Sequence, residues 1–138
     1  MDSTTLEDRG FGNWSRFDRS AERSLITSLP KDFGVYAVLF SEQQPREQGR
    51  SDIAYIGRAA NQNGLRGRVR QYFHPGPTQT TNIAMKRRLS EPSIGLRLGY
   101  VTTATVAGAK ALESELILGF NVEHGELPPF NRARALDL

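Results

Sequence analysis

The chain has 138 residues, the size of one domain, and its 38% hydrophobic and 24% charged residues lie within the ordinary range for a globular protein. It has no cysteine, which excludes a disulfide framework, a thiolate zinc site and a thiol nucleophile. No apolar run approaches the ~18 residues that a membrane span needs, and residues 1–22 contain no secretory apolar segment. We therefore expect a cytoplasmic protein with no membrane partner.

The net charge of +3 is modest, but the charges are unevenly distributed. Residues 53–90 contain no Asp or Glu. The cations of this stretch are Arg58, Arg66, Arg68, Arg70, Lys86, Arg87 and Arg88. A basic block without carboxylates suits a polyanion, because phosphates release counterions to Lys and Arg. The alternative is a basic helix face that only contacts water.

Residues 1–28 form a polar N-terminal extension, in which we predict one short helix over residues 20–28 that ends before Leu29-Pro30. Residues 34–40 are rich in Val, Tyr and Phe and predict a strand. Because successive side chains alternate and both faces are apolar, this strand should be covered on both sides. A polar loop over 41–51 and a second strand over 52–57 complete a long-looped antiparallel hairpin.

A helix over residues 65–73 follows, with an apolar stripe that predicts its core face. Arg66 and Arg70 lie on one helical face, whereas Arg68 lies one turn below Tyr72, beside the stripe. An arginine there either lines a cleft or extends from the edge of the core into water. The pattern alone leaves both readings open.

Thr80 or Thr81 is expected to cap a helix that reaches residue 89 and carries Lys86, Arg87 and Arg88. Residues 95–103 predict a third strand, and residues 106–121 the clearest helix. The sequence therefore indicates the α+β class, with a small central three-stranded antiparallel sheet flanked by helices.

Glu113 falls inside the apolar stripe of that last helix, whereas Glu115 falls outside it. Carboxylates are almost never fully buried without a partner. Glu113 is therefore salt-bridged, at the margin of the stripe in water, or a metal ligand that faces a cleft.

Five elements in order resemble the GIY-YIG nuclease family, which includes homing endonucleases, restriction enzymes and the incision subunit of bacterial nucleotide excision repair. These elements are Gly34-Val35-Tyr36, Tyr55-Ile56-Gly57, the helix 65–72, the segment 111–117 and Pro129-Phe130-Asn131. The resemblance implies a nuclease domain over residues 29–132, with 133–138 as a C-terminal tail. Either tyrosine triplet alone would be uninformative. The resemblance depends on all five elements occurring in this order.

The resemblance implies a role for each matching residue. The expected catalytic residues are Tyr36, Tyr55, Arg68, Tyr72 and Asn131, and the expected metal ligand is Glu113. Arg58 stands where many members have lysine. We expect Arg58, Arg66, Arg70, Lys86, Arg87 and Arg88 to contact nucleic acid.

The implied activity is hydrolysis of phosphodiester bonds, with DNA as the expected partner, to give 5′-phosphate and 3′-hydroxyl ends. One divalent cation, Mg²⁺ or Mn²⁺, suits a site with one carboxylate, because Mg²⁺ keeps waters and substrate phosphate oxygens as its other ligands. One site cuts one strand at a time, so either a monomer or a homodimer is compatible. The alternatives are a non-cleaving nucleic-acid-binding module of the same fold and an unrelated basic α+β interaction domain.

Overall fold

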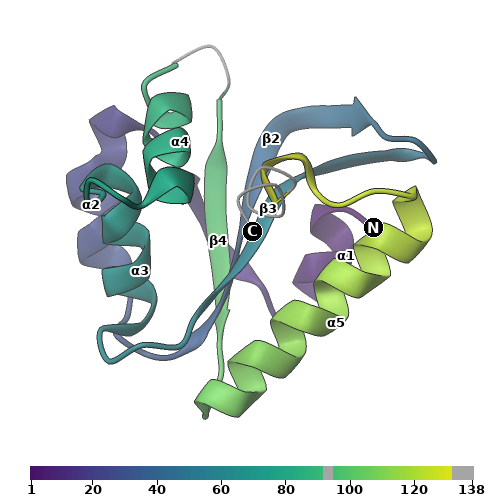
Figure 1. Cartoon of the computed structure of the whole chain (residues 1–138). Coiled ribbons are helices and arrows are strands. Elements are labelled where there is room, and N and C mark those ends of the chain that lie inside the picture. Colours follow the sequence, from purple (N-terminus) through teal and green to yellow (C-terminus); the bar gives the residue numbers. More distant parts are fainter. Residues whose placement is uncertain (92–94, 132–138) are drawn as a thin grey trace.

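A four-stranded antiparallel sheet forms the centre of the protein (Figure 1). The computed structural model describes residues 1–91 and 95–131, so the predicted tail, residues 133–138, lies outside the described residues. The strands are β1 (Gly12–Arg16), β2 (Gly34–Pro45), β3 (Arg50–Ala59) and β4 (Arg97–Thr102), in the spatial order β1-β4-β2-β3. The α+β class with a small antiparallel sheet is therefore confirmed, but the sheet has four strands where three were predicted.

Helices cover both faces of this sheet (Figure 1). On one side are α2 (Glu22–Ser28), α3 (Gly64–Phe73) and α4 (Thr80–Leu89), and on the other are α1 (Ser3–Asp8) and α5 (Val106–His124). Two hydrophobic cores follow from the alternation of side chains along β2. Tyr36 and Val38 pack with the α2, α3 and α4 side, and Val35 and Ala37 pack with the α1 and α5 side. The prediction of a strand covered on both faces is confirmed.

The β2–β3 hairpin differs from its predicted form. The prediction of a long polar loop over residues 41–51 is wrong. The two strands continue through these polar residues and pair as far as Pro45 opposite Arg50. The register shifts between Val38 and Gln44, which marks a bulge. Backbone pairing does not require apolar side chains, so an exposed end of a hairpin has no hydrophobic signal in the sequence.

The fourth strand comes from the N-terminal stretch. The sequence predicted one short helix over residues 20–28, and α2 with the preceding 3₁₀ turn η1 (Arg19–Ala21) accounts for it. The stretch also contains α1, whose Leu6 is fully buried, and β1, which pairs with β4. Trp14 of β1 lies against Gly99, where any side chain on residue 99 would collide with the indole ring.

The start of α4 also differs from the prediction. Gln79, rather than Thr80 or Thr81, is the N-cap residue, and its side chain makes no capping bond to the helix. The Gln79 side chain instead accepts a hydrogen bond from the backbone N–H of Gly76 at 2.7 Å. The turn of residues 76–79 thus uses the polar group that would otherwise cap the helix.

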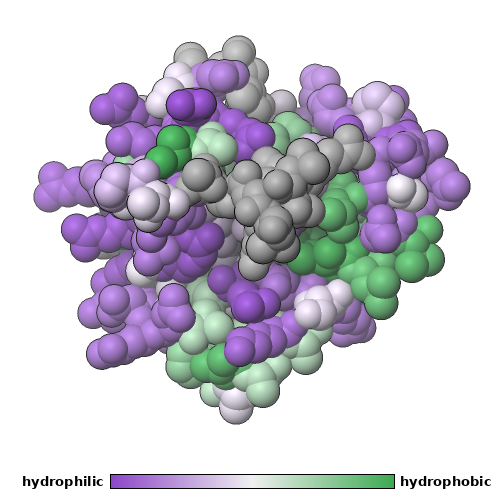
Figure 2. Space-filling view, in the orientation of Figure 1, coloured by the Kyte–Doolittle hydropathy of each residue, from purple (hydrophilic) through white to green (hydrophobic). Residues whose placement is uncertain are grey.

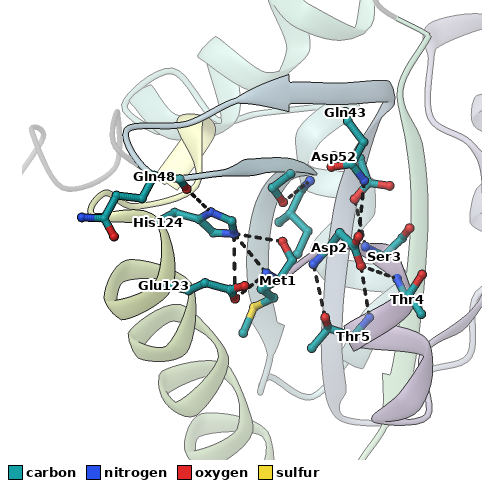
Figure 3. Close-up of polar contacts among 12 residues, drawn as sticks. Met1, Asp2, Ser3, Thr4, Thr5, Gln43, Gln48, Asp52, Glu123 and His124 are labelled. Carbon is teal, nitrogen blue, oxygen red and sulfur yellow. Dashed lines mark hydrogen bonds and ion pairs between the residues drawn. The ribbon is translucent and has the colours of Figure 1, made fainter.

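Polar contacts fix residues at the start of the chain against the hairpin and the end of α5 (Figure 3). The backbone N–H of Ser3 donates to the Asp52 carboxylate at 2.9 Å. The buried His124 donates from Nδ1 to the carbonyl oxygen of Gln48 at 2.7 Å. These bonds join segments that are distant in sequence and brace the far end of the β2–β3 hairpin.

The surface seen in Figure 2 is mostly hydrophilic, and hydrophobic residues gather over its lower right, on the side of α5. Among the described residues, the exposed large hydrophobic side chains are Leu118 and Val122, both on α5. In the described part of the chain, no helix is long and apolar enough to cross a membrane.

Candidate active site

Three tyrosines form the floor of the candidate site. Tyr36 of β2 and Tyr55 of β3 lie diagonally on the same face of the sheet, because Val38 is the direct partner of Tyr55. Tyr72 of α3 packs edge-on against both rings, with ring centroids 6.0 and 6.3 Å away. All three side chains are buried, and the hydroxyl groups of Tyr36 and Tyr72 are hydrogen-bonded to each other.

Gly57 explains how the two strand tyrosines fit together. It pairs with Tyr36 across the hairpin. A Cβ atom on residue 57 would lie 2.6 Å from the Tyr36 Cζ and hydroxyl oxygen and 2.6 Å from Cε1 of Tyr55. The glycine of the Tyr55-Ile56-Gly57 triplet thus leaves the space that both rings occupy.

Arg68 lies over this aromatic cluster. Its guanidinium carbon is 4.5 Å from the centroid of the Tyr72 ring, a cation–π contact. Its Nη1 donates to Gln71 Oε1 at 3.1 Å and to Asn82 Oδ1 at 2.9 Å. The two readings that the sequence left open are thus resolved in favour of a cleft, because Arg68 lines a cavity with Tyr36 and Tyr55.

The electrostatics of the cluster follow from burial. Burial raises the pKa of Tyr36 above its ordinary value, although Arg68 and the bond to Tyr72 act in the opposite direction. Burial likewise raises the pKa of Tyr72. Burial alone would lower the pKa of Arg68, but the surrounding tyrosines outweigh it and the pKa is raised. Both tyrosines are therefore neutral and Arg68 is cationic near neutral pH.

The Tyr55 hydroxyl is the polar group of the cluster with the fewest contacts. It is buried and has no hydrogen-bond partner of ordinary geometry among the described residues. It nevertheless lies close enough to the Arg68 guanidinium to contribute to the raised pKa of that group. The hydroxyl is therefore next to the Arg68 guanidinium without a well-formed hydrogen bond to it.

Glu113 extends from α5 toward the same region. Its side chain is 5% exposed, and Arg58 Nη1 donates to its Oε1 at 2.8 Å. The sequence left a salt bridge, a position in water and a metal-ligand role open for Glu113. The structure excludes the position in water and shows the salt bridge. Arg58, which was expected to contact nucleic acid, lines the cavity while bound to Glu113.

A polar cavity of about 310 Å³ joins these groups. Its lining consists of Tyr36, Tyr55, Arg58, Ala60, Asn61, Arg68, Val106 and Lys110. A larger cavity, of about 510 Å³, is lined by residues that include Lys31, Arg66 and Arg70, with no carboxylate or tyrosine among them. We take the smaller cavity as the candidate site, because its lining brings three cationic side chains and two tyrosines together, and Arg58 links it to Glu113.

Asn131 braces the strand that carries Tyr55. Its side-chain oxygen accepts from the backbone N–H of Ile56 at 2.9 Å, and its side-chain nitrogen donates to the Ile56 carbonyl at 2.9 Å. The amide thus imitates a neighbouring strand at the outer edge of β3. Asn131 is buried and touches the site through the backbone rather than through the cavity.

The remaining predicted cations lie outside the cavity. Arg66 donates to the carbonyl oxygens of Leu29 and Thr27, at the C-terminal end of α2. Arg88 stacks over the Phe130 ring at 4.0 Å. Arg70, Lys86 and Arg87 are exposed to solvent.

Sequence reasoning did not select Asn82 or Lys110. Lys110 lies one helical turn before Glu113, so its place on the cavity was visible from the spacing on α5. Asn82 gave no such signal, because only the packing of α4 against α3 brings its side chain to Arg68.

Glu113 is the buried carboxylate closest to the ion-paired wall of the cavity and the candidate ligand for a cation there. In the described ranges, no three or more His, Cys, Asp or Glu side chains gather to hold a metal. One buried carboxylate beside a polar cavity of this size leaves room for waters and phosphate oxygens, which Mg²⁺ retains in protein sites.

No protein-family model and no curated protein matches this chain by sequence. Among solved structures, the chain is similar to the N-terminal GIY-YIG endonuclease domain of UvrC from Thermotoga maritima, which was crystallised with its catalytic magnesium. The two are 21% identical, the match covers 81% of this chain and 97% of that domain, and the TM-score is 0.48.

Proposed function

We propose that this protein is a divalent-metal-dependent endonuclease that hydrolyses phosphodiester bonds of nucleic acid, with DNA as the substrate. The observation that carries the proposal is the convergence of separate motif residues on one cavity. Tyr36, Tyr55 and Arg68 come from two strands and a helix, and Arg58 joins Glu113 to the same place. The sequence resemblance of these motifs to GIY-YIG nucleases gives the direction of the chemistry.

In this proposal Arg68 binds the scissile phosphate. Its Nη1 is held by two amide oxygens, so the N–H groups on Nε and Nη2 supply the donors for a bidentate contact. Its raised pKa keeps it charged throughout the working pH range. A planar guanidinium that is fixed before the substrate arrives stabilises the negative charge that develops at phosphorus.

The tyrosine hydroxyls position the attacking water. Because burial raises the pKa of Tyr36, it is protonated near neutral pH and is a poor base by itself. Its bond to Tyr72 holds its hydroxyl in place at the cavity wall. Water attacks phosphorus and gives up a proton to solvent, the bond to the 3′ oxygen breaks, and that oxygen takes up a proton from solvent. The products carry a 5′-phosphate and a 3′-hydroxyl.

Glu113 is the proposed ligand of the divalent cation, Mg²⁺ or Mn²⁺. When bound, the cation would neutralise charge on the phosphate and on the leaving oxygen. In the structure Arg58 binds Oε1 of the Glu113 carboxylate at 2.8 Å, and we propose that it releases this oxygen when the cation binds. The freed guanidinium would then contact the nucleic acid backbone from its place in the cavity wall.

The exposed cations Arg70, Lys86 and Arg87 would guide the polyanion to the site. Arg66 and Arg88 already have partners in the structure, so their contribution to nucleic acid binding would be smaller. The proposed nuclease domain spans residues 29–132, and a monomer or a homodimer remains compatible with one-strand cleavage.

The decisive experiment compares Glu113→Gln with Glu115→Gln on supercoiled plasmid, linear duplex and single strands, with and without Mg²⁺. Glu115 lies on the same helix, but its side chain is 61% exposed and pairs with Arg9. We expect cleavage by wild type and by Glu115→Gln that stops on chelation, and a loss of at least about 100-fold in Glu113→Gln. Chelator-resistant cleavage, or full activity of Glu113→Gln, would contradict the mechanism. Binding without cleavage by wild type would favour the non-cleaving module.

A further inference from the structure

A polar chain connects the turn before α4 to the guanidinium of Arg68. Asn82, on α4, is 6% exposed and accepts from Arg68 Nη1 through Oδ1 at 2.9 Å. Its Nδ2 donates to Gln79 Oε1 at 3.0 Å. The same Gln79 side-chain oxygen accepts from the backbone N–H of Gly76 at 2.7 Å. The backbone N–H of Gln79 in turn donates to the Gly76 carbonyl oxygen at 3.1 Å.

The direction of each amide in this chain is fixed by its partners. Arg68 has only donors, so the Asn82 atom that faces it must be the oxygen. The Asn82 nitrogen then faces Gln79, which must present its oxygen, and that oxygen also matches the Gly76 N–H. Each hydrogen-bonded atom of this chain therefore faces a complementary one, and the chain runs from the exposed Gln79 to the buried Asn82.

The polar chain lies outside the cavity and contacts it only through Arg68. Arg68 lines the cavity, whereas Asn82 and Gln79 do not. Nη1 has two N–H groups, and Asn82 and Gln71 accept one each. With the Tyr72 ring against its plane, the guanidinium is held on one edge and one face, which leaves the donors on Nε and Nη2 for a ligand.

We propose that Asn82 is a positioning residue for Arg68: it fixes the guanidinium in the orientation that binds the scissile phosphate, and the turn of residues 76–79 sets the orientation of Asn82. The proposal deepens the proposed function and rests on it for the identity of the ligand. Asn82 does not touch the substrate. Its effect on cleavage passes through Arg68 alone.

One test does not depend on activity. Two acceptors on Nη1 should slow rotation about the Cζ–Nη1 bond, so the wild-type protein should show separate, slowly exchanging Arg68 Nη resonances by NMR, identified by their loss in Arg68→Lys. In Asn82→Ala these resonances should merge or broaden. In Asn121→Ala, which changes an exposed asparagine on α5, they should stay as in wild type. Unchanged Arg68 resonances in Asn82→Ala would overturn the proposal.

A second test uses a double-mutant cycle in plasmid cleavage. Asn82→Ala should lower kcat by roughly 10- to 100-fold with little change in KM, the usual range for a residue that supports a site indirectly. It should lower kcat less than Arg68→Ala does, because Gln71 still holds Nη1. The double variant should be no slower than Arg68→Ala alone. Additive losses would show that Asn82 acts independently of Arg68, and would overturn the proposal.

Asn82→Asp keeps the experiment decisive if Asn82→Ala does not fold. The aspartate retains the shape and the acceptor for Arg68, but its negative charge pairs with the guanidinium. We expect a folded protein whose cleavage falls by roughly 10- to 100-fold relative to wild type, because the aspartate cancels the charge that Arg68 offers to the phosphate. Wild-type cleavage by Asn82→Asp would mean that Asn82 serves only the fold. If wild type does not cleave at all, the proposed function fails, whereas the NMR comparison still decides whether Asn82 holds Arg68.

Discussion

Arg58 and Glu113 hold each other at 2.8 Å between β3 and α5, with the carboxylate buried and the guanidinium about one-third exposed. The ion pair places the proposed metal ligand and a cavity-lining cation in competition. A cation that binds Glu113 through Oε1 would exchange with Arg58, and the exchange would present a positive charge to the cavity.

Arg58→Met should weaken the fold in the absence of metal and strengthen its response to metal. Removal of the guanidinium leaves a buried carboxylate without this partner, at a cost of about 1–3 kcal/mol. The same change frees Glu113 for a cation. We expect a lower Tm than wild type without Mg²⁺ and a larger rise in Tm on Mg²⁺ addition. The result that would count against the exchange is an equal Mg²⁺-induced rise in both proteins.

Glu113→Gln should remove the Mg²⁺-induced rise in Tm, because a neutral amide is a far weaker ligand for a hard cation. The measurement is a thermal unfolding series over increasing Mg²⁺, with Glu115→Gln as the control. A Mg²⁺ response that persists in Glu113→Gln would place the cation elsewhere.

Gly57→Ala should disrupt the tyrosine cluster. The added methyl would lie 2.6 Å from Tyr36 and from Tyr55, so the rings must move, at a cost of about 1–3 kcal/mol in the free energy of unfolding. Cleavage should fall further than stability explains. Gly12→Ala is the matched control, because no atom lies within 4 Å of a Cβ built on Gly12. Urea unfolding and plasmid cleavage of both variants provide the measurement, and equal behaviour would refute the close-packed cluster.

Tyr36 and Tyr72 should resist ionisation until the protein unfolds. Burial raises the pKa of both above the ordinary tyrosine value of about 10. Above that pH the unfolded state releases protons that the folded state retains, so stability falls as the pH rises further. Tyrosinate absorbance during an alkaline titration should therefore contain a component from Tyr36 and Tyr72 that appears only together with unfolding. Ionisation of Tyr36 and Tyr72 before unfolding would contradict the burial argument.

Asn131→Ala should destabilise the edge of β3. It leaves the backbone N–H and C=O of Ile56 without their side-chain partner, at a cost of about 2–4 kcal/mol. Hydrogen exchange of the Ile56 amide should accelerate, whereas Asn121→Ala at an exposed position of α5 should change neither quantity. Retention of Ile56 protection in Asn131→Ala would show that the brace is dispensable.

Outside the N-terminal stretch and the end of the β2–β3 hairpin, the sequence by itself determined the local elements and the residues that share a face. Alternation placed Tyr36 and Val38 on one side of β2, and the helical period placed Arg68 under Tyr72 and Glu113 on the inner side of α5. These features depend on backbone geometry that repeats every two or 3.6 residues, so neighbours along the chain carry the information.

Only the tertiary structure decided which groups meet. The polar strand β1 has no apolar alternation, and its pairing with β4 depends on a glycine at position 99 that accepts Trp14. The pairing of Arg58 with Glu113 and the contact of Asn82 with Arg68 join residues on different elements. A side-chain hydrogen bond has no period along the chain. It depends on the packing of whole elements, so the partner of a buried charge is fixed only when the fold is complete.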